Sequence, residues 1–171
     1  ALTAVLVTHN ETSTGITNDL ETIAGIVKGE FNKLLLVDAI SSLGSIRLPV
    51  DSWDLDVVVA GSQKGWMCPP GLAMISVSER AWKAAESAKM PKFYFNLADA
   101  KKSFGSGQTP WTPAMSLMFG LDFAVQKMLE QGDMEAVYAF HQEIAEYTRN
   151  GLVDLGLELV AKSAARASNT V

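Results

Sequence analysis

Four short runs of apolar residues alternate with helical patterns, and this alternation constrains the fold more than any other feature of the sequence. The runs span Leu2–Thr8, Leu34–Val37, Val57–Ala60 and Leu72–Val77. Each has the length and the β-branched content of a buried strand. Continuous apolar strands that are joined by a crossover helix are typical of a sheet covered on both faces. The pattern therefore predicts an α/β fold with three α/β/α layers around a doubly wound, mainly parallel sheet.

The segment between the first two runs is predicted to form the crossover helix. Asn18 can cap its N-terminus. Apolar residues then recur on one face at helical spacing, at Leu20, Ile23, Ala24 and Val27. Together with the two flanking strands, this helix completes a β-α-β unit.

The pattern changes after the fourth run. Ser78 can cap a helix that extends to about Ala88, and the polar stretch Lys101–Thr109 then predicts an irregular loop. Thr112 and Pro113 are suited to the N-cap and the first turn of a long apolar helix that continues toward Gln131. Its composition predicts that this helix is mostly buried.

Asp133 is predicted to open a further, amphipathic helix that ends near Gly151 or Gly156. Its apolar residues on one side are Val137, Phe140, Ile144 and Tyr147. We expect residues 1–131 to belong to a large domain and residues 132–171 to begin a smaller C-terminal domain.

The net charge of −5 argues against a nucleic-acid partner and against an anionic membrane surface. The single cysteine, Cys68, excludes an internal disulfide framework, and no apolar run approaches the roughly 20 residues of a membrane span. The apolar start at 1–7 lacks the basic leader of a signal peptide. These observations predict a cytoplasmic protein. The start without Met and the strand-like last residues suggest an internal fragment.

Two polar residues with complementary chemistry stand at successive strand ends, where doubly wound folds bind their ligands. Asp38 follows the second apolar run and Lys64 follows the third. Taken alone, Asp38 is a candidate cap for the turn 41–44, and Lys64 a solvated loop residue. Taken together, they match pyridoxal phosphate, which needs a lysine for a Schiff base and an anion beside its protonated pyridine nitrogen.

The segment Leu55–Lys64, followed by Pro69–Ala73, resembles the lysine signature of class V aminotransferases. The segments 8–15, 37–44 and 108–113 are similar, in the expected order, to the alanine-glyoxylate and serine-glyoxylate branch. Within this branch, the chain also resembles bacterial proteins named soluble hydrogenase small subunit. That name does not imply hydrogenase chemistry, because one cysteine cannot ligate a nickel–iron site or a four-thiolate cluster.

The resemblance implies the fold of type I pyridoxal-phosphate transferases, with residues 1–131 in the cofactor-binding domain. It further implies that Lys64 forms the Schiff base and moves the proton of the substrate α-carbon. The other implied cofactor contacts are Asp38 at the pyridine nitrogen, Thr12 at the phenolic oxygen, Ile40 on the ring and Gln63 at the phosphate. The loop residues Gln108, Thr109 and Thr112 resemble those that reach the phosphate of the neighbouring subunit, which implies a homodimer.

Five further residues have a structural and a functional interpretation. His9 is a possible second-shell acid or base, but a hydrogen-bonded structural histidine is favoured. Glu11 is expected to bond the backbone of its own turn. Tyr94 and Trp111 border either the substrate pocket or a subunit interface. Cys68 is interpreted as a packing residue, although a nucleophilic thiolate there would fit a cysteine desulfurase.

Three parts of the family site are not identifiable in this sequence: the phosphate-binding helix N-terminus, the aromatic residue that stacks on the ring, and the arginine that binds the substrate carboxylate. We transfer the arginine role to none of Arg47, Arg80, Arg149 and Arg166. The resemblance implies a transaminase that moves an amino group from alanine or serine to a 2-oxo acid such as glyoxylate, and that is inactive as this chain alone. The alternatives are another pyridoxal-phosphate enzyme, such as a desulfurase or lyase, and a non-catalytic binding subunit.

Overall fold

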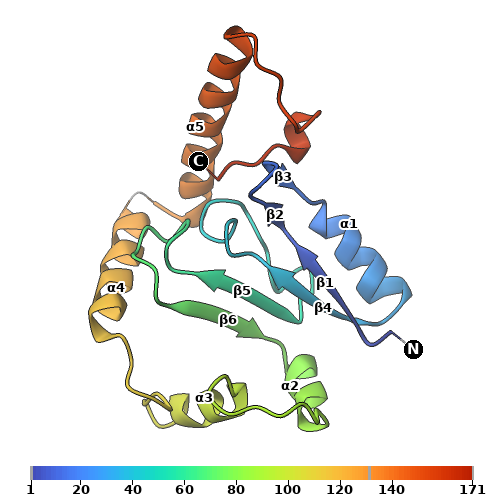
Figure 1. Cartoon of the computed structure of the whole chain (residues 1–171), viewed down its shortest axis with the longest axis vertical. Helices are drawn as coiled ribbons and strands as arrows, with labels where there is room; N and C mark the ends of the chain where they lie inside the picture. The colour runs from blue at the N-terminus through green and yellow to red at the C-terminus, as the bar shows by residue number, and fades with distance from the viewer. Residues whose placement is uncertain (1, 131, 171) are drawn as a thin grey trace.

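A four-stranded sheet forms the centre of the computed structural model, which describes residues 2–130 and 132–170 (Figure 1). The strand order is β1-β4-β5-β6, with bounds Ala4–Thr8, Leu34–Asp38, Val57–Gly61 and Ala73–Val77. The first three strands are parallel and β6 is antiparallel. The four predicted strands and the mainly parallel sheet are therefore confirmed.

The crossover between β1 and β4 is helical, as predicted, but its cap is a different residue. Helix α1 spans Leu20–Ala24 and continues as a π-helical segment, η1, over Gly25–Glu30. Asp19 accepts the capping hydrogen bond from Thr22 N at 3.1 Å. The predicted cap, Asn18, is wrong because its amide donates instead to the carbonyl of Thr8 at the end of β1, at 2.8 Å. A tertiary partner thus replaced the local one.

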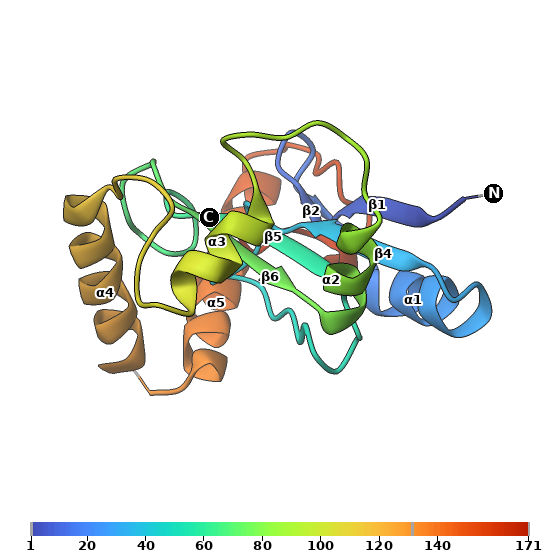
Figure 2. The same ribbon diagram turned by 90° about the horizontal axis from the view of Figure 1, so that it is seen from below.

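The two faces of the sheet differ in what covers them. Strand residues alternate between the faces, so Leu35 and Val37 join the core under α1 while Leu36 and Asp38 turn the other way. Figure 2 shows α1 and the segment 40–55 on one side of the sheet. The opposite face carries an open groove of about 390 Å³, where Leu6 is 76% exposed. Among the described residues, the core is thus built on one face.

A short antiparallel hairpin follows β1. Its strands are β2, Asn10–Glu11, and β3, Ile16–Thr17. Near the other end of the chain, a short 3₁₀ turn, η2, covers Ala164–Arg166. Ala167 then forms an antiparallel bridge with Ile16, so the C-terminal segment packs against this hairpin.

Helix α2 spans Glu79–Glu86, and Ser78 caps it as predicted, by accepting a bond from Ala81 N at 3.0 Å. Helix α3 spans Leu97–Phe104, so the prediction of an irregular loop over 101–109 is wrong in its first half. Asn96 starts this helix because its side chain accepts a bond from Ala98 N and donates to Asp99.

Helix α4 spans Met115–Glu130 and begins two residues later than expected. Thr112 is not its cap: the amide of Met115 bonds the carbonyl of Pro113 instead. The prediction of a mostly buried helix is also wrong for this chain, since only Ala124 and Met128 are buried in it and Phe119 is 69% exposed. Only one narrow stripe of α4 contacts other described residues. The predicted end at Gln131 lies outside the described residues.

Helix α5 spans Met134–Asp154, and Asp133 caps it as predicted, with a bond from Ala136 N at 3.1 Å. The helix ends before Gly156, where the backbone turns to a φ of +82°. Its buried residues are Val137 and Ala145, whereas three of the four predicted apolar residues are exposed, namely Phe140, Ile144 and Tyr147. In the described residues, no helix is both long and apolar enough to cross a membrane.

Candidate active site

The parallel strands β1, β4 and β5 end at the same edge of the sheet, and α5 rises above this edge (Figure 1). The chain leaves these strands into three loops that carry Thr12, Asp38 and Lys64. Because the carboxyl ends of parallel strands lie together, side chains that are distant in the sequence meet here. This edge is where the predicted site residues are found.

A cavity of about 430 Å³, the Lys64 cavity, brings Thr12 and Lys64 together. Its lining consists of Thr12, Ser41, Ser45, Lys64, Gly65, Met67, Phe140, His141 and Thr170. His141 and Thr170 come from the C-terminal part of the chain and were not predicted. Nothing in the local sequence marks either residue, since His141 is placed here by the position of α5 and Thr170 by the contact of the C-terminal segment with the hairpin. Burial lowers the pKa of His141, which favours its neutral imidazole.

The Lys64 side chain is exposed, and hydrogen bonds of Ser62 and Cys68 hold its loop in place. Ser62 is fully buried: its hydroxyl donates to the carbonyl of Pro69 at 2.7 Å and accepts from Leu72 N at 3.2 Å. The amide of Cys68 bonds the carbonyl of Ser62 at 3.0 Å. None of the ion pairs within residues 2–130 and 132–170 involves the Lys64 amine. The loop therefore presents an amine that is available to a ligand.

Asp38 lies on the open face of the sheet, not in an apolar interior as its strand suggested. Its side chain is exposed, and its Oδ1 accepts a bond from Ile40 N at 2.9 Å, which closes a tight turn. The turn role that the sequence allowed for Asp38 is thus present. This bond engages one carboxylate oxygen, and Asp38 lines the groove together with Thr8 and Leu36.

Ile40 and Gln63 line a neighbouring hollow of about 380 Å³ on the same open face. The structure thus places the predicted residues along one edge of the sheet, but around adjoining hollows and not in a single cavity. Asp38 lines the groove, and Ile40 and Gln63 line the hollow beside it. Thr12 and Lys64 line the Lys64 cavity.

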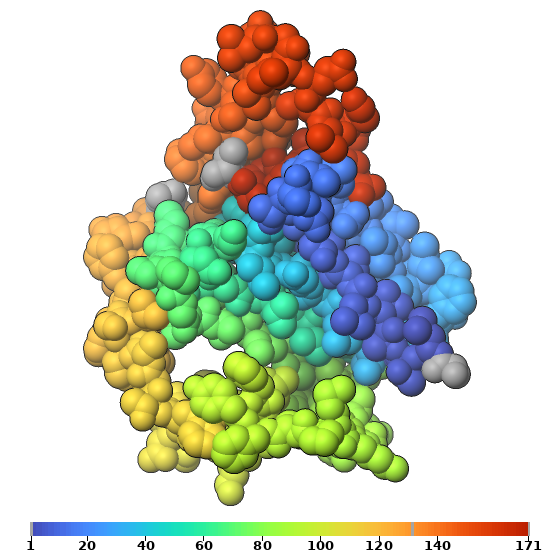
Figure 3. Space-filling model, in the orientation of Figure 1, coloured from blue at the N-terminus to red at the C-terminus, as the bar shows by residue number. Residues whose placement is uncertain are grey.

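The predicted phosphate loop lies elsewhere. Thr109 and Thr112 line a hollow of about 490 Å³ between their own segment and β6, which is visible in Figure 3 between the yellow segment and the sheet. The hydroxyl of Thr109 donates to the carbonyl of Trp111 at 2.7 Å. Neither Gln108 nor the two threonines lines the Lys64 cavity of this chain.

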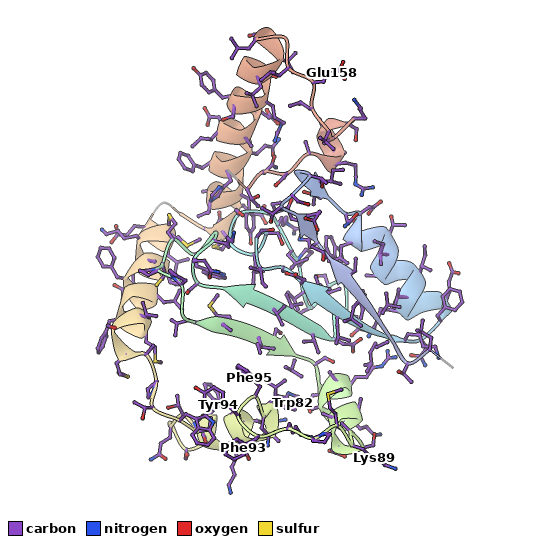
Figure 4. All side chains as sticks on the ribbon, in the orientation of Figure 1. Trp82, Lys89, Phe93, Tyr94, Phe95 and Glu158 are labelled. Carbon is purple, nitrogen blue, oxygen red and sulfur yellow. The ribbon has the colours of Figure 1, made fainter. Side chains whose placement is uncertain are left out.

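Tyr94 and Trp111 belong to an exposed aromatic cluster next to this loop. Their ring centroids lie 5.3 Å apart, and Phe93 packs against Trp111 edge to face at 5.6 Å. Figure 4 shows Phe93, Tyr94 and Phe95 together at the end of the molecule that is remote from α5. Neither ring lines the Lys64 cavity, and the choice between pocket and subunit interface stays a prediction.

Three other candidates have structural partners. His9 is 3% exposed, and its Nδ1 lies 2.9 Å from the hydroxyl of Ser42; burial lowers its pKa to about 4. Glu11 accepts bonds from the hydroxyl and the amide of Ser13, which lower its pKa. Cys68 is 6% exposed, and its Sγ lies 3.6 Å from the carbonyl of Leu117. The structural interpretations are therefore supported.

The four arginines are engaged away from the Lys64 cavity. Arg47 pairs with Glu135, and Arg80 donates to the carbonyl of Asn32. The other two hold the C-terminal segment: Arg149 donates to Ser168 and Asn169, and Arg166 to Thr17 and Asn18. Within the described residues, no group of three or more His, Cys, Asp or Glu side chains is placed to hold a metal ion.

The donor set fits pyridoxal phosphate in its chemistry. A lysine amine suits the aldehyde, a free carboxylate oxygen suits a protonated ring nitrogen, and a threonine hydroxyl suits the phenolic oxygen. The structure supplies these three at Lys64, Asp38 and Thr12. The phosphate would need further donors, and Gln63 in the neighbouring hollow is one candidate.

Comparison with known proteins agrees with this chemistry. A family model described as aminotransferase class-V matches residues 2–171. A soluble hydrogenase small subunit from Synechococcus sp. is 48% identical over 92% of this chain and 41% of its own length. A serine–glyoxylate aminotransferase from Methylorubrum extorquens is 40% identical over 98% of this chain and 43% of its own length.

Among solved structures, pyridoxamine–pyruvate aminotransferase from Mesorhizobium loti matches 98% of this chain and 43% of its own, with a TM-score of 0.91 and 33% sequence identity. This likeness confirms the predicted α/β fold of type I pyridoxal-phosphate transferases. The chain spans about two fifths of the length of the relatives that it matches.

Proposed function

The chain belongs to the class V aminotransferase family, and from this we propose that the protein carrying it is a pyridoxal-phosphate-dependent transaminase with Lys64 as its cofactor-bonding residue. The proposed reaction moves an amino group from a small amino acid, alanine or serine, to a 2-oxo acid such as glyoxylate. The relative from Methylorubrum extorquens carries the corresponding name, serine–glyoxylate aminotransferase.

One observation carries the proposal: the exposed Lys64 and Thr12 both line the Lys64 cavity at the carboxyl ends of the strands. A lysine that served only to solubilise a loop would have no reason to share a cavity with five hydroxyl and imidazole side chains. They are Thr12, Ser41, Ser45, His141 and Thr170.

Pyridoxal phosphate, when bound, supplies an electron-withdrawing ring that acidifies the α-carbon of an amino-acid substrate. The Lys64 amine would hold the cofactor aldehyde and, once released, take the proton from the substrate α-carbon and return it. The free oxygen of Asp38 would accept a hydrogen bond from the ring nitrogen and keep it protonated; a bond to a charged group contributes about 1.5–3 kcal/mol. Thr12 would donate to the phenolic oxygen.

The outer residues complete the binding. Ile40 offers an apolar side chain to the ring, and the Gln63 amide can donate to phosphate. Gln108, Thr109 and Thr112 lie far from the Lys64 cavity of their own chain, which supports the proposal that they serve the site of a second copy in a homodimer. A cytoplasmic location, expected from the single cysteine, stays a prediction.

Borohydride trapping tests the role of Lys64. The product of the complete reading frame is incubated with pyridoxal phosphate, reduced and digested, and the peptides are mapped by mass spectrometry. We expect the label on the peptide that contains Lys64, and its loss in Lys64→Ala but not in Lys89→Ala, which removes an exposed lysine remote from the strand ends (Figure 4). Binding without a label on Lys64, or no binding, contradicts the proposal.

Substrate assays separate the transaminase from its alternatives. We expect glycine to form from glyoxylate with serine or alanine as the amino donor. A cysteine desulfurase would instead release sulfur from cysteine and depend on an accessible thiol, which the burial of Cys68 argues against. A protein that binds no cofactor and co-purifies with a stable partner would be a binding subunit.

A further inference from the structure

Asn10, in the first strand of the hairpin after β1, has a buried side chain whose polar atoms are all engaged. It is 2% exposed. Its amide nitrogen donates to Ser41 Oγ at 2.9 Å and to Thr170 Oγ1 at 3.3 Å. Its amide oxygen accepts from Thr17 Oγ1 at 3.1 Å, and its backbone carbonyl accepts from Ser41 Oγ at 2.9 Å. One side chain thus joins three distant segments.

Two of the partners of Asn10 line the Lys64 cavity. Ser41 and Thr170 both belong to its wall, as does Thr12, two residues beyond Asn10 in the chain. Asn10 itself does not line the cavity. Its hydrogen bonds therefore lie directly behind the wall, and they determine where the hydroxyls of Ser41 and Thr170 stand.

The C-terminal segment 167–170 is held against the same hairpin by its backbone. Ala167 pairs with Ile16, and the amide of Ser168 bonds the carbonyl of Gly15 at 2.9 Å. The hydroxyls of Ser168 and Thr170 lie 2.8 Å apart. Figure 3 shows the blue atoms of the hairpin region beside the red atoms of the C-terminal segment. The hydrogen bond from the Asn10 amide to Thr170 Oγ1 connects this contact to the wall of the Lys64 cavity.

A buried amide restricts the positions of its hydrogen-bond partners, because breaking one of these bonds leaves a buried polar group without a partner, which is unfavourable. Ser41 accepts from the Asn10 side chain and donates to its carbonyl, and this reciprocal pair leaves the serine a single favourable rotamer. Loss of Thr170 Oγ1 would remove one partner from the shared amide. The hairpin would then be free to move together with Thr12.

We propose that Asn10 is a positioning residue that, through Thr170 and Ser41, clamps the C-terminal segment to the wall of the Lys64 cavity. It sets the position of the Thr12 hydroxyl without touching the cofactor. The inference rests on the proposed function for its link to cofactor binding, but the clamp itself concerns only residues of this chain.

Two variants of Thr170 test the clamp. Thr170→Val keeps the shape of the side chain and removes the hydroxyl, whereas Thr170→Ser keeps the hydroxyl. In the product of the complete reading frame, we expect Thr170→Val to raise the dissociation constant of pyridoxal phosphate about tenfold, the effect of losing one well-placed hydrogen bond. Thr170→Ser should stay within about twofold of the wild type.

A second measurement does not depend on the cofactor. Amide hydrogen exchange in the cofactor-free protein should speed up at residues 10–17 in Thr170→Val and not in Thr170→Ser. Thr22→Val is the matched control, because it removes an exposed hydroxyl that bonds Asp19 far from the cavity. It should change neither the exchange at 10–17 nor the affinity.

The outcomes separate the two claims. If the wild type binds no pyridoxal phosphate, the proposed function fails, and the exchange data still decide on the clamp. If the cofactor binds and Thr170→Val matches Thr170→Ser in both affinity and exchange, the clamp is refuted. A uniform increase in exchange across the chain, without a specific effect at 10–17, also refutes it. In Asn10→Ala, the added Thr170→Val should have no further effect on affinity, since the amide that it served is gone.

Discussion

The backbones of Gly44 and Gly65 pack directly against each other, so that a Cβ atom on Gly44 would lie 3.0 Å from the carbonyl carbon of Gly65. Gly44 belongs to the turn that follows Asp38, and Gly65 follows Lys64. Gly44 also has a φ of +98°, which side chains rarely tolerate. The two loops that carry the proposed amine and carboxylate are therefore held in register by a contact that only glycine permits.

Gly65→Ala should disrupt this contact. The new Cβ would lie 2.8 Å from the carbonyl oxygen of Leu43 and 2.9 Å from the amide of Ser45, and neither backbone atom can move aside easily. We expect a loss of about 2 kcal/mol in the free energy of unfolding, measured with urea. Gly151→Ala, in the last turn of α5, where nothing lies within 4 Å of an added Cβ, should instead raise the free energy of unfolding by about 0.5 kcal/mol. Equal stabilities of the two variants would contradict the contact.

A buried ion pair links the crossover helix to the sheet. Asp56 is fully buried and accepts bonds from Lys28 Nζ at 2.6 Å, Leu35 N at 2.8 Å and Ser78 Oγ at 3.0 Å. Lys28→Ala removes the counter-charge of this buried carboxylate. It should lower the free energy of unfolding, measured with urea, by about 3 kcal/mol.

Lys127→Ala is the control for this pair, because it removes an exposed lysine that bonds Glu130. This variant should lower the free energy of unfolding by less than about 1 kcal/mol. A similar cost for both lysines would mean that the buried pair contributes no more than a surface pair.

His9 should make the stability depend on pH. Burial lowers its pKa to about 4 in the folded protein, whereas the unfolded value is 6.5. Between these values the unfolded state binds the additional proton, so the free energy of unfolding falls as the pH falls from 6.5 to about 4. The effect is on the order of 3 kcal/mol. Urea unfolding at a series of pH values measures it.

His9→Asn is the matched variant for the pH series, because its amide can keep the bond to Ser42 without a titrating ring. Its stability should decline less steeply over the same window. The remaining slope includes contributions from His141, whose pKa is also lowered by burial, and from Glu11, whose pKa is lowered by its bonds to Ser13. An unchanged profile would exclude His9 as the source.

Cys68 should react slowly in the folded protein. Its thiol is buried against the Leu117 carbonyl and the backbone of Gly120, where iodoacetamide has no access. We expect slow alkylation of the native protein and complete alkylation in urea, followed by mass spectrometry. Rapid native alkylation would reopen the desulfurase alternative.

Local chemistry made part of the fold predictable. Ser78 and Asp133 cap the helices that their sequences indicate, because a cap bonds a backbone amide only three residues away. Asn18 failed as a cap because the end of β1 offered its amide a better partner. The burial of α4 could not be predicted either, since an apolar helix is buried only where other residues cover it.

Some residues of the candidate site could likewise be predicted from the local sequence, and others could not. Lys64, Asp38 and Thr12 could be selected because each follows an apolar strand, and parallel strands bring their ends together. His141, Thr170 and Asn10 carry no local signal. Their roles come from tertiary packing, in which α5 carries His141 to the cavity and the C-terminal segment brings Thr170 to Asn10, and no periodicity in the sequence encodes this packing.

The bond between Asn10 and Thr170 joins residues that are 160 positions apart. A chain emerging from the ribosome at about 5–20 residues per second would complete β1 before the C-terminal segment, so the hairpin beside β1 could not obtain its final hydrogen bond until residue 170 had been released. The Thr12 loop is thus synthesised well before it can reach its native bonding. During that interval, nascent chains would carry Lys64 beside an unfinished cavity.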